Sequence, residues 1–240
     1  MKDSQVRDRF KICFAKDSVL LDKIKYLRGR IFFNKDAKDE DEFDQFCEHL
    51  AVIDTHSANV IGTYRLLPGS VAKKHIGFYS ETEFDLGNIK KNCKGELLEM
   101  SRACVLPSYR KYQIINLLWK ELLSYFAANN VAYVFGCPSI ERPCPETIGK
   151  LFAFLKEKHF APKQFMVYPL KDKTYHFTKD IKNYSQKEIV KLLPSLIRGY
   201  LKMGAAVCGM PAWDQEFGTA DFFMMLDTKL INNNYRERFV

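Results

Sequence analysis

The sequence predicts one α/β domain over residues 1–240, in which helices flank a mixed, mostly antiparallel sheet. Segments with the apolar pattern of strands alternate along the chain with segments of helical periodicity, and such segments pack as helices on a sheet. Two early strands follow one another across a short turn, which favours antiparallel pairing. No stretch resembling a linker divides the chain, which is long enough to bury a full core.

The elements of the first half follow from local patterns. Residues 9–15 alternate as a strand does, and residues 20–32 carry apolar side chains at helical spacing. Asp17 or Ser18 is suited to cap that helix, because either side chain can accept hydrogen bonds from free backbone N–H groups. An acidic loop at 36–44, strands at 47–54 and 59–67, and an irregular segment at 68–95 are expected next.

The second half continues the alternation. Pro107 ends the strand expected at 96–106, and residues 131–137 form a short, continuously apolar strand, as is typical of a buried central position. Pro194 lies inside the helical segment 186–203, so a kink or a restart is expected there. The remaining predicted elements are helices at 114–129 and 145–159 and strands at 164–170 and 218–227.

The composition indicates a globular protein of the cytoplasm. Apolar residues make up 47% and charged residues 28%, no apolar run is long enough to span a membrane, and the charged N-terminus has no apolar core of a signal peptide. The cysteines are scattered and form no CxxC, and the five histidines lack metal-binding spacing, so reduced thiols and no metal are expected. The cysteines are Cys13, Cys47, Cys93, Cys104, Cys137, Cys144 and Cys208.

The positive charge is concentrated in one region. The net charge is +8, and residues 148–202 contain twelve Lys or Arg and four Asp or Glu. A basic region suits an acidic partner, which leaves nucleic acid, an anionic membrane leaflet and an acidic carrier protein as candidates. A solvated lysine-rich surface is the alternative. No nucleic-acid recognition motif accompanies the charge, so no nucleic-acid partner is expected.

The stretch from Glu96 to Ile115 carries the clearest functional pattern. A strand ends at Pro107, a basic turn with Arg110 and Lys111 follows, and a helix then begins. Free N–H groups and the positive dipole end at a helix start can hold a phosphate, and the two cations would add charge there. Every strand–turn–helix unit has such an end, so a purely structural role is the alternative.

Several segments together carry a resemblance to a known family. The longest is LPSLIRGYLKMGAAVCGMPAWDQEFGTADFFMMLD at 193–227. The others are LRGRIFF at 27–33, DEFD at 41–44, GTYRLLP at 62–68, FYSETEFDL at 78–86, LLEMSRACVLPSYR at 97–110, LLW at 117–119 and FGC at 135–137. From about residue 20 onward the chain resembles the bacterial ornithine–acyl-carrier-protein N-acyltransferases of the GNAT superfamily, which make lyso-ornithine lipids and are related to the acyl-homoserine-lactone synthases.

The resemblance implies an enzyme that moves a (3-hydroxy)fatty acyl group from acyl carrier protein to the α-amine of an amino acid. Ornithine is the family's usual acceptor, with glycine and lysine as alternatives. No permanently bound cofactor is implied, because the acyl-phosphopantetheine arm is a co-substrate. The lipophilic product implies transient contact with the inner membrane leaflet. GNAT phosphate loops carry small residues that admit coenzyme A, whereas Gln113 and Ile115 here would crowd its pyrophosphate, which favours the carrier protein as donor.

The resemblance also implies roles for individual residues. Aminolysis of a thioester needs a base, for which Glu99 is the candidate, directly or through a water, with Arg102 as its catalytic companion; an ion pair between the two is the alternative. Arg102 and Arg65 can grip the acceptor's carboxylate with a planar fork, or pair structurally with Asp41 or Asp44. Further site residues are Arg28 for ordering the site, Arg110, Lys111, Gln113, Ile114 and Ile115 for the donor phosphate, and Phe32, Phe78, Phe84 and Trp119 for the acyl chain or the core.

Other interpretations stay open at this point. A synthase of the homoserine-lactone type would release a lactone made from S-adenosylmethionine, and a non-catalytic module would only bind carrier protein or anionic lipid. Cys104 beside the central motif is an alternative nucleophile, although nothing marks a histidine that pairs with it. Trp213, Asp214, Gly218 and Asp221 belong to the family signature, but their roles do not follow from the sequence.

Overall fold

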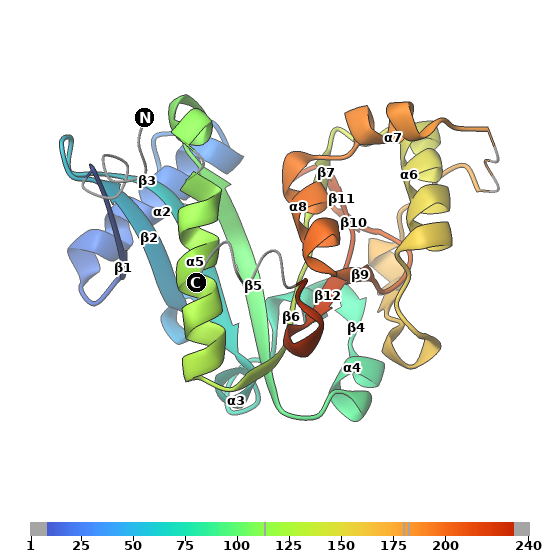
Figure 1. The fold of residues 1–240 in the computed structure, drawn as a ribbon, viewed down its shortest axis with the longest axis horizontal. Coiled ribbons are helices and arrows are strands. Elements are labelled where there is room, and N and C mark those ends of the chain that lie inside the picture. Colours follow the sequence, from blue (N-terminus) through green and yellow to red (C-terminus); the bar gives the residue numbers. More distant parts are fainter. Residues whose placement is uncertain (1–8, 113, 180, 182, 233–240) are drawn as a thin grey trace. The chain divides into compact units, whose positions relative to one another are not determined.

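The computed structural model describes residues 9–112, 114–179, 181 and 183–232. The chain forms two compact units, each with its own core (Figure 1). Unit 1 contains the described residues up to 76 and those from 100 to 130, and unit 2 contains those from 77 to 99 and from 131 to 232. The single domain expected over 1–240 stays a prediction.

Unit 1 consists of a sheet with a long helix on each face. Its elements are β1 (Phe10–Phe14), α2 (Ser18–Phe32), β2 (Glu48–Asp54), β3 (Asn59–Pro68), α3 (Gly69–Ala72), the second half of β5 (Glu96–Val105) and α5 (Ile114–Ala128). The strand order is β1-β2-β3-β5, with β1–β2 and β2–β3 antiparallel and a bulge after Val52. Ile24 and Leu27 of α2 pack with Ala51 on one face. On the other face Trp119 of α5 meets Tyr64 edge-on.

The start and one side of α2 position the acidic loop. The Asp17 carboxylate accepts a hydrogen bond from Leu20 N at 2.8 Å, so the predicted cap is confirmed. Farther along, a Cβ on Gly29 would lie 1.8 Å from the carbonyl oxygen of Ala37. Only glycine permits this approach. The loop therefore runs directly against the helix, and Asp39 is buried as a result.

Unit 2 combines one larger sheet with two small ones. The strand order of the larger sheet is β5 (its first half), β6 (Val131–Gly136), β12 (Met224–Asp227) and β9 (Ala206–Val207), with β5–β6 parallel and the later pairs antiparallel. The predicted central place of β6 is confirmed. The small sheets pair β10 (Ala212–Asp214), β11 (Thr219–Asp221) and β7 (Ser139–Glu141), and β4 (Phe84–Asp85) with β8 (Tyr168–Pro169). The helices are α4 (Gly87–Asn92), α6 (Pro145–Lys158), α7 (Gln186–Leu192) and α8 (Ser195–Met203).

Most predicted elements are confirmed, including the α/β class with mostly antiparallel pairing. Pro194 ends one helix and starts the next, as α7 and α8 show, so the expected interruption is a restart. Among the described residues, no helix is both long enough and apolar enough to cross a membrane.

Two predicted strands were wrong in extent. The expected strand at 164–170 is a 3₁₀ turn, Lys163–Phe165, followed by the two residues of β8, because Pro169 has no N–H with which to extend a ladder. The expected strand at 218–227 divides into β11 and β12, which belong to different sheets. Phe222 and Phe223 between them are fully buried, so no change in polarity marks the division.

Candidate active site

A buried network of ion pairs begins at Arg28 of α2 in unit 1. The Arg28 side chain is fully buried, and its Nε donates to Asp39 Oδ2 at 2.6 Å. Its two terminal nitrogens donate to the two oxygens of Asp44 at 2.7 and 3.1 Å. This two-pronged pairing matches the planar guanidinium to a carboxylate. Arg28 therefore fixes the middle of the acidic loop at Asp39 and its end at Asp44.

Two arginines from the sheet complete the network. Arg65 of β3 is 1% exposed and donates through Nη1 to Asp41 and Asp44. Arg102 of β5 donates to Asp39 and Asp41, each at 3.1 Å. The structure thus brings together the predicted residues of the loop and the sheet and adds Asp39. Three guanidinium groups and three carboxylates balance each other's charge.

The electrostatics of the network favour the ionised forms. Burial alone would raise the pKa of Asp44, but the hydrogen bond and charge of Arg28, with the charge of Arg65, hold that pKa well below its usual value. Burial opposes the charge on Arg65, but Asp41 raises its pKa above the ordinary value. His49, whose Nε2 lies 3.1 Å from the Asp44 carbonyl oxygen, has a pKa lowered by burial. Asp44 and Arg65 are therefore held in their charged forms beside a neutral histidine.

The backbone of β5 is irregular at Arg102. Its φ angle is +50°, in the left-handed region that residues other than glycine rarely adopt. The preceding residue, Ser101, accepts a hydrogen bond at Oγ from Arg65 Nε at 2.9 Å. Such strain persists where the surroundings hold it in place, and it is common at functional sites.

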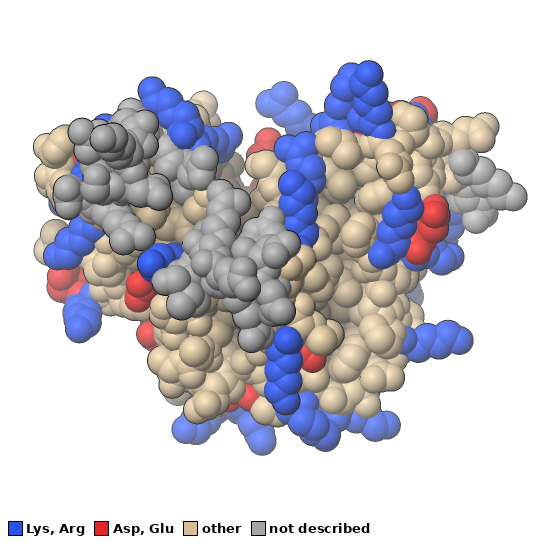
Figure 2. Space-filling model, viewed as in Figure 1, with Lys and Arg blue, Asp and Glu red and all other residues tan. Residues whose placement is uncertain are grey.

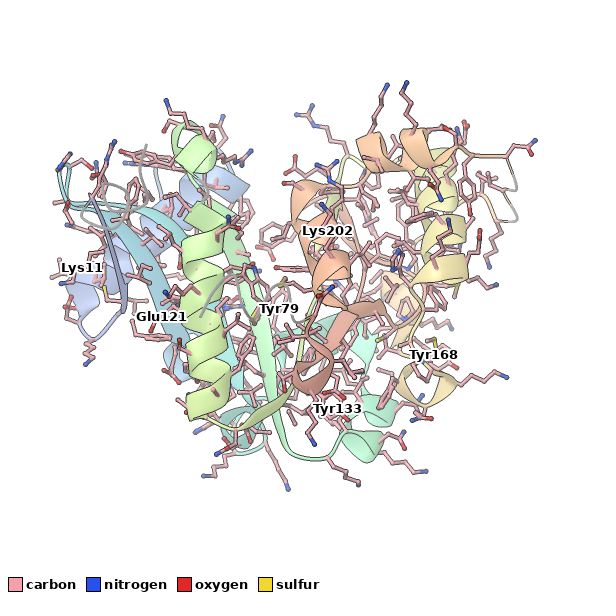
Figure 3. The ribbon with its side chains drawn as sticks, viewed as in Figure 1. Lys11, Tyr79, Glu121, Tyr133, Tyr168 and Lys202 are labelled. Atoms are coloured by element: carbon pink, nitrogen blue, oxygen red, sulfur yellow. The ribbon has the colours of Figure 1, made fainter. Side chains whose placement is uncertain are left out.

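Glu99 lies in unit 2, on the first half of β5, and its carboxylate is closely held. It is 1% exposed and accepts hydrogen bonds from Tyr79 N at 2.8 Å, Ser80 N at 2.7 Å and Ser80 Oγ at 2.5 Å. Tyr79, labelled in Figure 3, begins the 3₁₀ turn Tyr79–Thr82. Cys137 Sγ lies 3.3 Å from Ser80 Oγ, so a thiol, a hydroxyl and a carboxylate form a chain. Burial raises the pKa of Cys137 well above its usual value, which keeps the thiol protonated.

A second acidic group lies beyond that turn in unit 2. Glu83, Asp214 of β10 and Asp221 of β11 each offer a carboxylate oxygen, and these atoms lie within 4.8 Å of one another. All three residues are buried. This spacing would also accommodate a metal ion, and it is the one such group found in the described part of the chain. The absence of a bound metal stays a prediction.

Glu83 should make the protein less stable as the pH rises. Burial, and after it the charges of Asp221 and Asp214, raise the pKa of Glu83 to about 9, against 4.5 for an ordinary glutamate. The folded state therefore keeps a proton that the unfolded chain releases. The stabilisation is complete below pH 4.5 and is lost progressively toward pH 9, at up to about 1.4 kcal/mol per pH unit.

Urea unfolding of the wild type and Glu83→Gln between pH 5 and pH 9 measures this effect. Because glutamine does not titrate, the free energy of unfolding of the variant should fall less steeply with pH than that of the wild type. Parallel pH profiles for the two proteins would contradict the assignment.

The expected donor-phosphate residues lie at the start of α5 in unit 1. Arg110 and Lys111 are exposed on the 3₁₀ segment Pro107–Tyr112, and Arg110 Nε donates to the Val105 carbonyl at 3.3 Å. Ile114 is fully buried, and Ile115 is half-buried. A Cβ on Gly62 would lie 2.9 Å from Ile114, so the helix start packs tightly on β3. Gln113 lies outside the described residues.

Three of the four expected acyl-pocket aromatics are buried in the cores of their units, and the fourth, Phe32, is partly buried. In unit 2, Phe78 meets Phe135 edge-on at 4.9 Å, and Phe84 contacts Phe223 at 5.8 Å. In unit 1, Trp119 is 4% exposed, and Phe32 packs against the core beneath α2. Their part in acyl binding stays a prediction.

Four residues of these clusters were missed as individual candidates: Asp39, Ser80, Glu83 and Cys137. Ser80 and Glu83 lie within FYSETEFDL and Cys137 within FGC, segments that already carried the resemblance, so that signal could have found them. Asp39 lies in the acidic loop among other carboxylates, and only the path of the loop against Gly29 distinguishes it.

Comparisons with known proteins agree with this arrangement. A family model described as an acetyltransferase (GNAT) domain matches residues 27–120. The L-ornithine N(alpha)-acyltransferase of Rhizobium meliloti (strain 1021) is 30% identical over 241 residues, which cover 92% of this chain and 81% of that protein. The protein of the same name from Brucella abortus (strain 2308) is 29% identical over 239 residues, covering 92% and 85%.

Solved structures show the same fold at low sequence identity. FeeM, an N-acyl amino acid synthase from uncultured soil microbes, has a TM-score of 0.56 at 10% identity and covers 95% of this chain and 94% of its own. The coenzyme-A-dependent acyl-homoserine lactone synthase BjaI has a TM-score of 0.54 at 13% identity, covering 92% and 82%. The GNAT-like fold class and the resemblance seen in the sequence are thus confirmed. The chain belongs to the L-ornithine N(alpha)-acyltransferase family of the GNAT superfamily and is an N-acyltransferase.

Proposed function

We propose that this enzyme transfers a (3-hydroxy)fatty acyl group from acyl carrier protein to the α-amine of ornithine. The observation that carries the proposal is the similarity over 92% of the chain to proteins named L-ornithine N(alpha)-acyltransferase. Glycine and lysine are the alternative acceptors. A lactone synthase is disfavoured because the curated relatives that match nearly the whole chain are named for ornithine.

The start of α5 supports the carrier protein as donor. GNAT loops that hold coenzyme A need small residues around the pyrophosphate, and this chain has Gln113 and Ile115 after its basic turn. The exposed cations Arg110 and Lys111 remain able to hold the single phosphate of a phosphopantetheine arm.

A basic surface on unit 2 supports docking of an acidic carrier protein. Figure 2 shows many Lys and Arg side chains and few carboxylates on this part of the surface. Exposed lysines of this kind raise the local concentration of an acidic partner. Those among the described residues of 148–202 are Lys156, Lys158, Lys163, Lys171, Lys179, Lys187, Lys191 and Lys202.

For the chemical step we propose that Glu99 is the base and that a relay carries the proton to it. The acceptor's nitrogen attacks the thioester carbonyl, the C–S bond breaks, and the proton lost by the amine passes to Glu99 and from there to the departing thiolate. Because Glu99 is 1% exposed, a relay is favoured over direct contact, and Ser80 Oγ already donates to this carboxylate. The charge that develops on the thioester oxygen also needs a preorganised hydrogen-bond donor.

We propose that the network of arginines orders the acidic loop, and that Arg102 serves the reaction by holding this loop in place. The guanidinium groups of Arg28, Arg65 and Arg102 already form ion pairs with loop carboxylates. They are therefore less suited to bind the acceptor's carboxylate. We also propose a cytoplasmic protein that contacts the inner leaflet transiently, because the acylated product is lipophilic.

Steady-state assays with acyl carrier protein and coenzyme A thioesters of one acyl chain test the donor. At equal concentrations, turnover with the carrier-protein thioester should be at least about tenfold higher. Only that donor lacks a pyrophosphate that the loop would crowd, and only that donor can dock on the basic surface. Mass spectrometry of the product should show an open N-acyl amino acid. Comparable turnover with both donors would contradict the donor assignment. A lactone formed from S-adenosylmethionine, or the absence of multiple turnover, would contradict the proposed reaction.

A further inference from the structure

Glu83, Asp214 and Asp221 form a buried cluster of carboxylates in unit 2. Glu83 is 2% exposed, and neither of its carboxylate oxygens has a hydrogen-bond partner among the described residues. Because an ionised carboxylate without a partner is costly to bury, Glu83 keeps a proton when no cation is bound, and a bound cation would take the place of that proton. The two aspartates lie on the antiparallel strands β10 and β11, so the small sheet presents both carboxylates toward Glu83.

The carboxylates of the two aspartates are held in place by separate hydrogen-bond donors. Asp221 accepts from Thr219 Oγ1 at 2.6 Å and from Ser139 Oγ at 3.1 Å. Asp214 accepts at Oδ1 from the backbone nitrogens of Glu216 and Phe217, at 2.9 and 3.2 Å. These bonds fix the direction of each carboxylate. The site is therefore preorganised and does not depend on flexible surface side chains.

The geometry suits an alkylammonium ion. An ammonium has three N–H donors and no acceptor, and three carboxylates offer one acceptor to each. Donors arranged tetrahedrally at about 2.9 Å place their acceptors about 4.7 Å apart. The three carboxylate oxygens here lie within 4.8 Å of one another, which fits that arrangement.

The site also adjoins the proposed chemistry within unit 2. Glu83 immediately follows the turn Tyr79–Thr82, whose Tyr79 and Ser80 bind the Glu99 carboxylate. The charge of Glu99 contributes to the raised pKa of Glu83, which shows that the two carboxylates share one electrostatic environment. A diamino acid that reacts near Glu99 would carry its second amine toward this acidic site.

We propose that Glu83, Asp214 and Asp221 bind the side-chain ammonium of the amino-acid acceptor and so select a diamino acid. The inference rests on the proposed N-acylation of ornithine, and it identifies the residues that determine acceptor specificity. It gives the acidic residues of the signature segment a role that the sequence alone did not supply.

The test compares ornithine with norvaline, which has the same carbon chain and no side-chain amine. We expect wild-type kcat/KM to favour ornithine at least 100-fold, because a site with buried polar groups rejects an analogue that leaves them unpaired. In Glu83→Gln and Asp214→Asn this preference should fall to about tenfold or less. Asp214→Asn keeps an oxygen for the N–H groups of Glu216 and Phe217, so one variant preserves the local hydrogen bonds. Glu216→Gln, which alters an exposed carboxylate two residues away, is the matched control and should keep the wild-type preference.

Three outcomes would overturn the inference. Equal acylation of both amino acids by the wild type would leave the N-acyltransferase standing without an ammonium site. An unchanged preference in both folded variants would exclude these carboxylates as its origin. Loss of the preference on treatment with a chelator, with recovery on adding Mg²⁺ or Ca²⁺, would assign the site to a metal. Failure of the wild type to acylate any amino acid would instead contradict the proposed function on which the inference rests.

Discussion

Replacement of Glu99 by glutamine is expected to lower kcat at least about 100-fold. The substitution keeps the size of the side chain and removes the group that accepts the amine's proton, and general-base catalysis typically contributes a factor of about 10² to 10⁴. The amide also puts an N–H donor where Tyr79 N, Ser80 N and Ser80 Oγ now donate. Single-turnover assays at saturating acceptor separate the chemical step from binding.

The same experiment distinguishes a base from a residue that only orders the turn. Loss of order alone should raise the KM for the acceptor and leave kcat and its pH profile nearly unchanged, whereas loss of the base should lower kcat across the profile. Ser80→Ala should lower kcat in the same direction if its hydroxyl relays the proton. Glu96→Gln changes a half-buried carboxylate on the same strand and is the control, with activity expected within a factor of about three. Normal kcat in Glu99→Gln would exclude the role.

Replacement of Asp44 by alanine is expected to destabilise the protein by about 3–5 kcal/mol. Arg28 and Arg65, which are 0% and 1% exposed, would each lose a counter-charge in the protein interior. Removing one partner of a buried ion pair leaves an uncompensated charge, which costs far more than losing a surface pair. Urea unfolding followed by circular dichroism measures the change in free energy.

Asp36→Ala is the matched control for that measurement. Asp36 lies in the same acidic loop and pairs with Arg30, but the two side chains are 77% and 60% exposed. Surface pairs of this kind contribute between zero and about 1 kcal/mol. Similar losses of stability in the two variants would show that the buried network does not hold unit 1 together.

The long elements were predictable because each buries either one face or its whole length, and this leaves a regular apolar pattern over many residues. α2 could be located from its apolar stripe and from Asp17, and β6 from its continuous apolar run. β11 and β12 could not be separated in the sequence, because Phe222 and Phe223 are buried as deeply as the strands around them. The local pattern of apolar residues indicates which segments are buried, but it does not indicate which sheet a strand joins.

The candidate site was predictable to the extent that a resemblance named its residues. The loop carboxylates and Arg28, Arg65 and Arg102 were expected together and do make contact, whereas their functional roles remain predictions. Glu83 is far in the sequence from Asp214 and Asp221, whereas these two aspartates lie on the successive paired strands β10 and β11. No spacing rule links Glu83 to the aspartates, because that proximity arises from tertiary structure.

The balance of three arginines and three aspartates in unit 1 divides the protein's electrostatics into two parts that respond differently to ionic strength. The internal set sums to zero and is shielded from mobile ions, so added salt scarcely weakens it. The net charge of +8 therefore comes from the remaining charged residues. Where such residues are exposed, their attraction for an anionic partner fades within a Debye length of about 8 Å at physiological salt. Added salt is therefore expected to weaken the proposed docking of an acidic carrier protein and to leave the architecture of the loop intact.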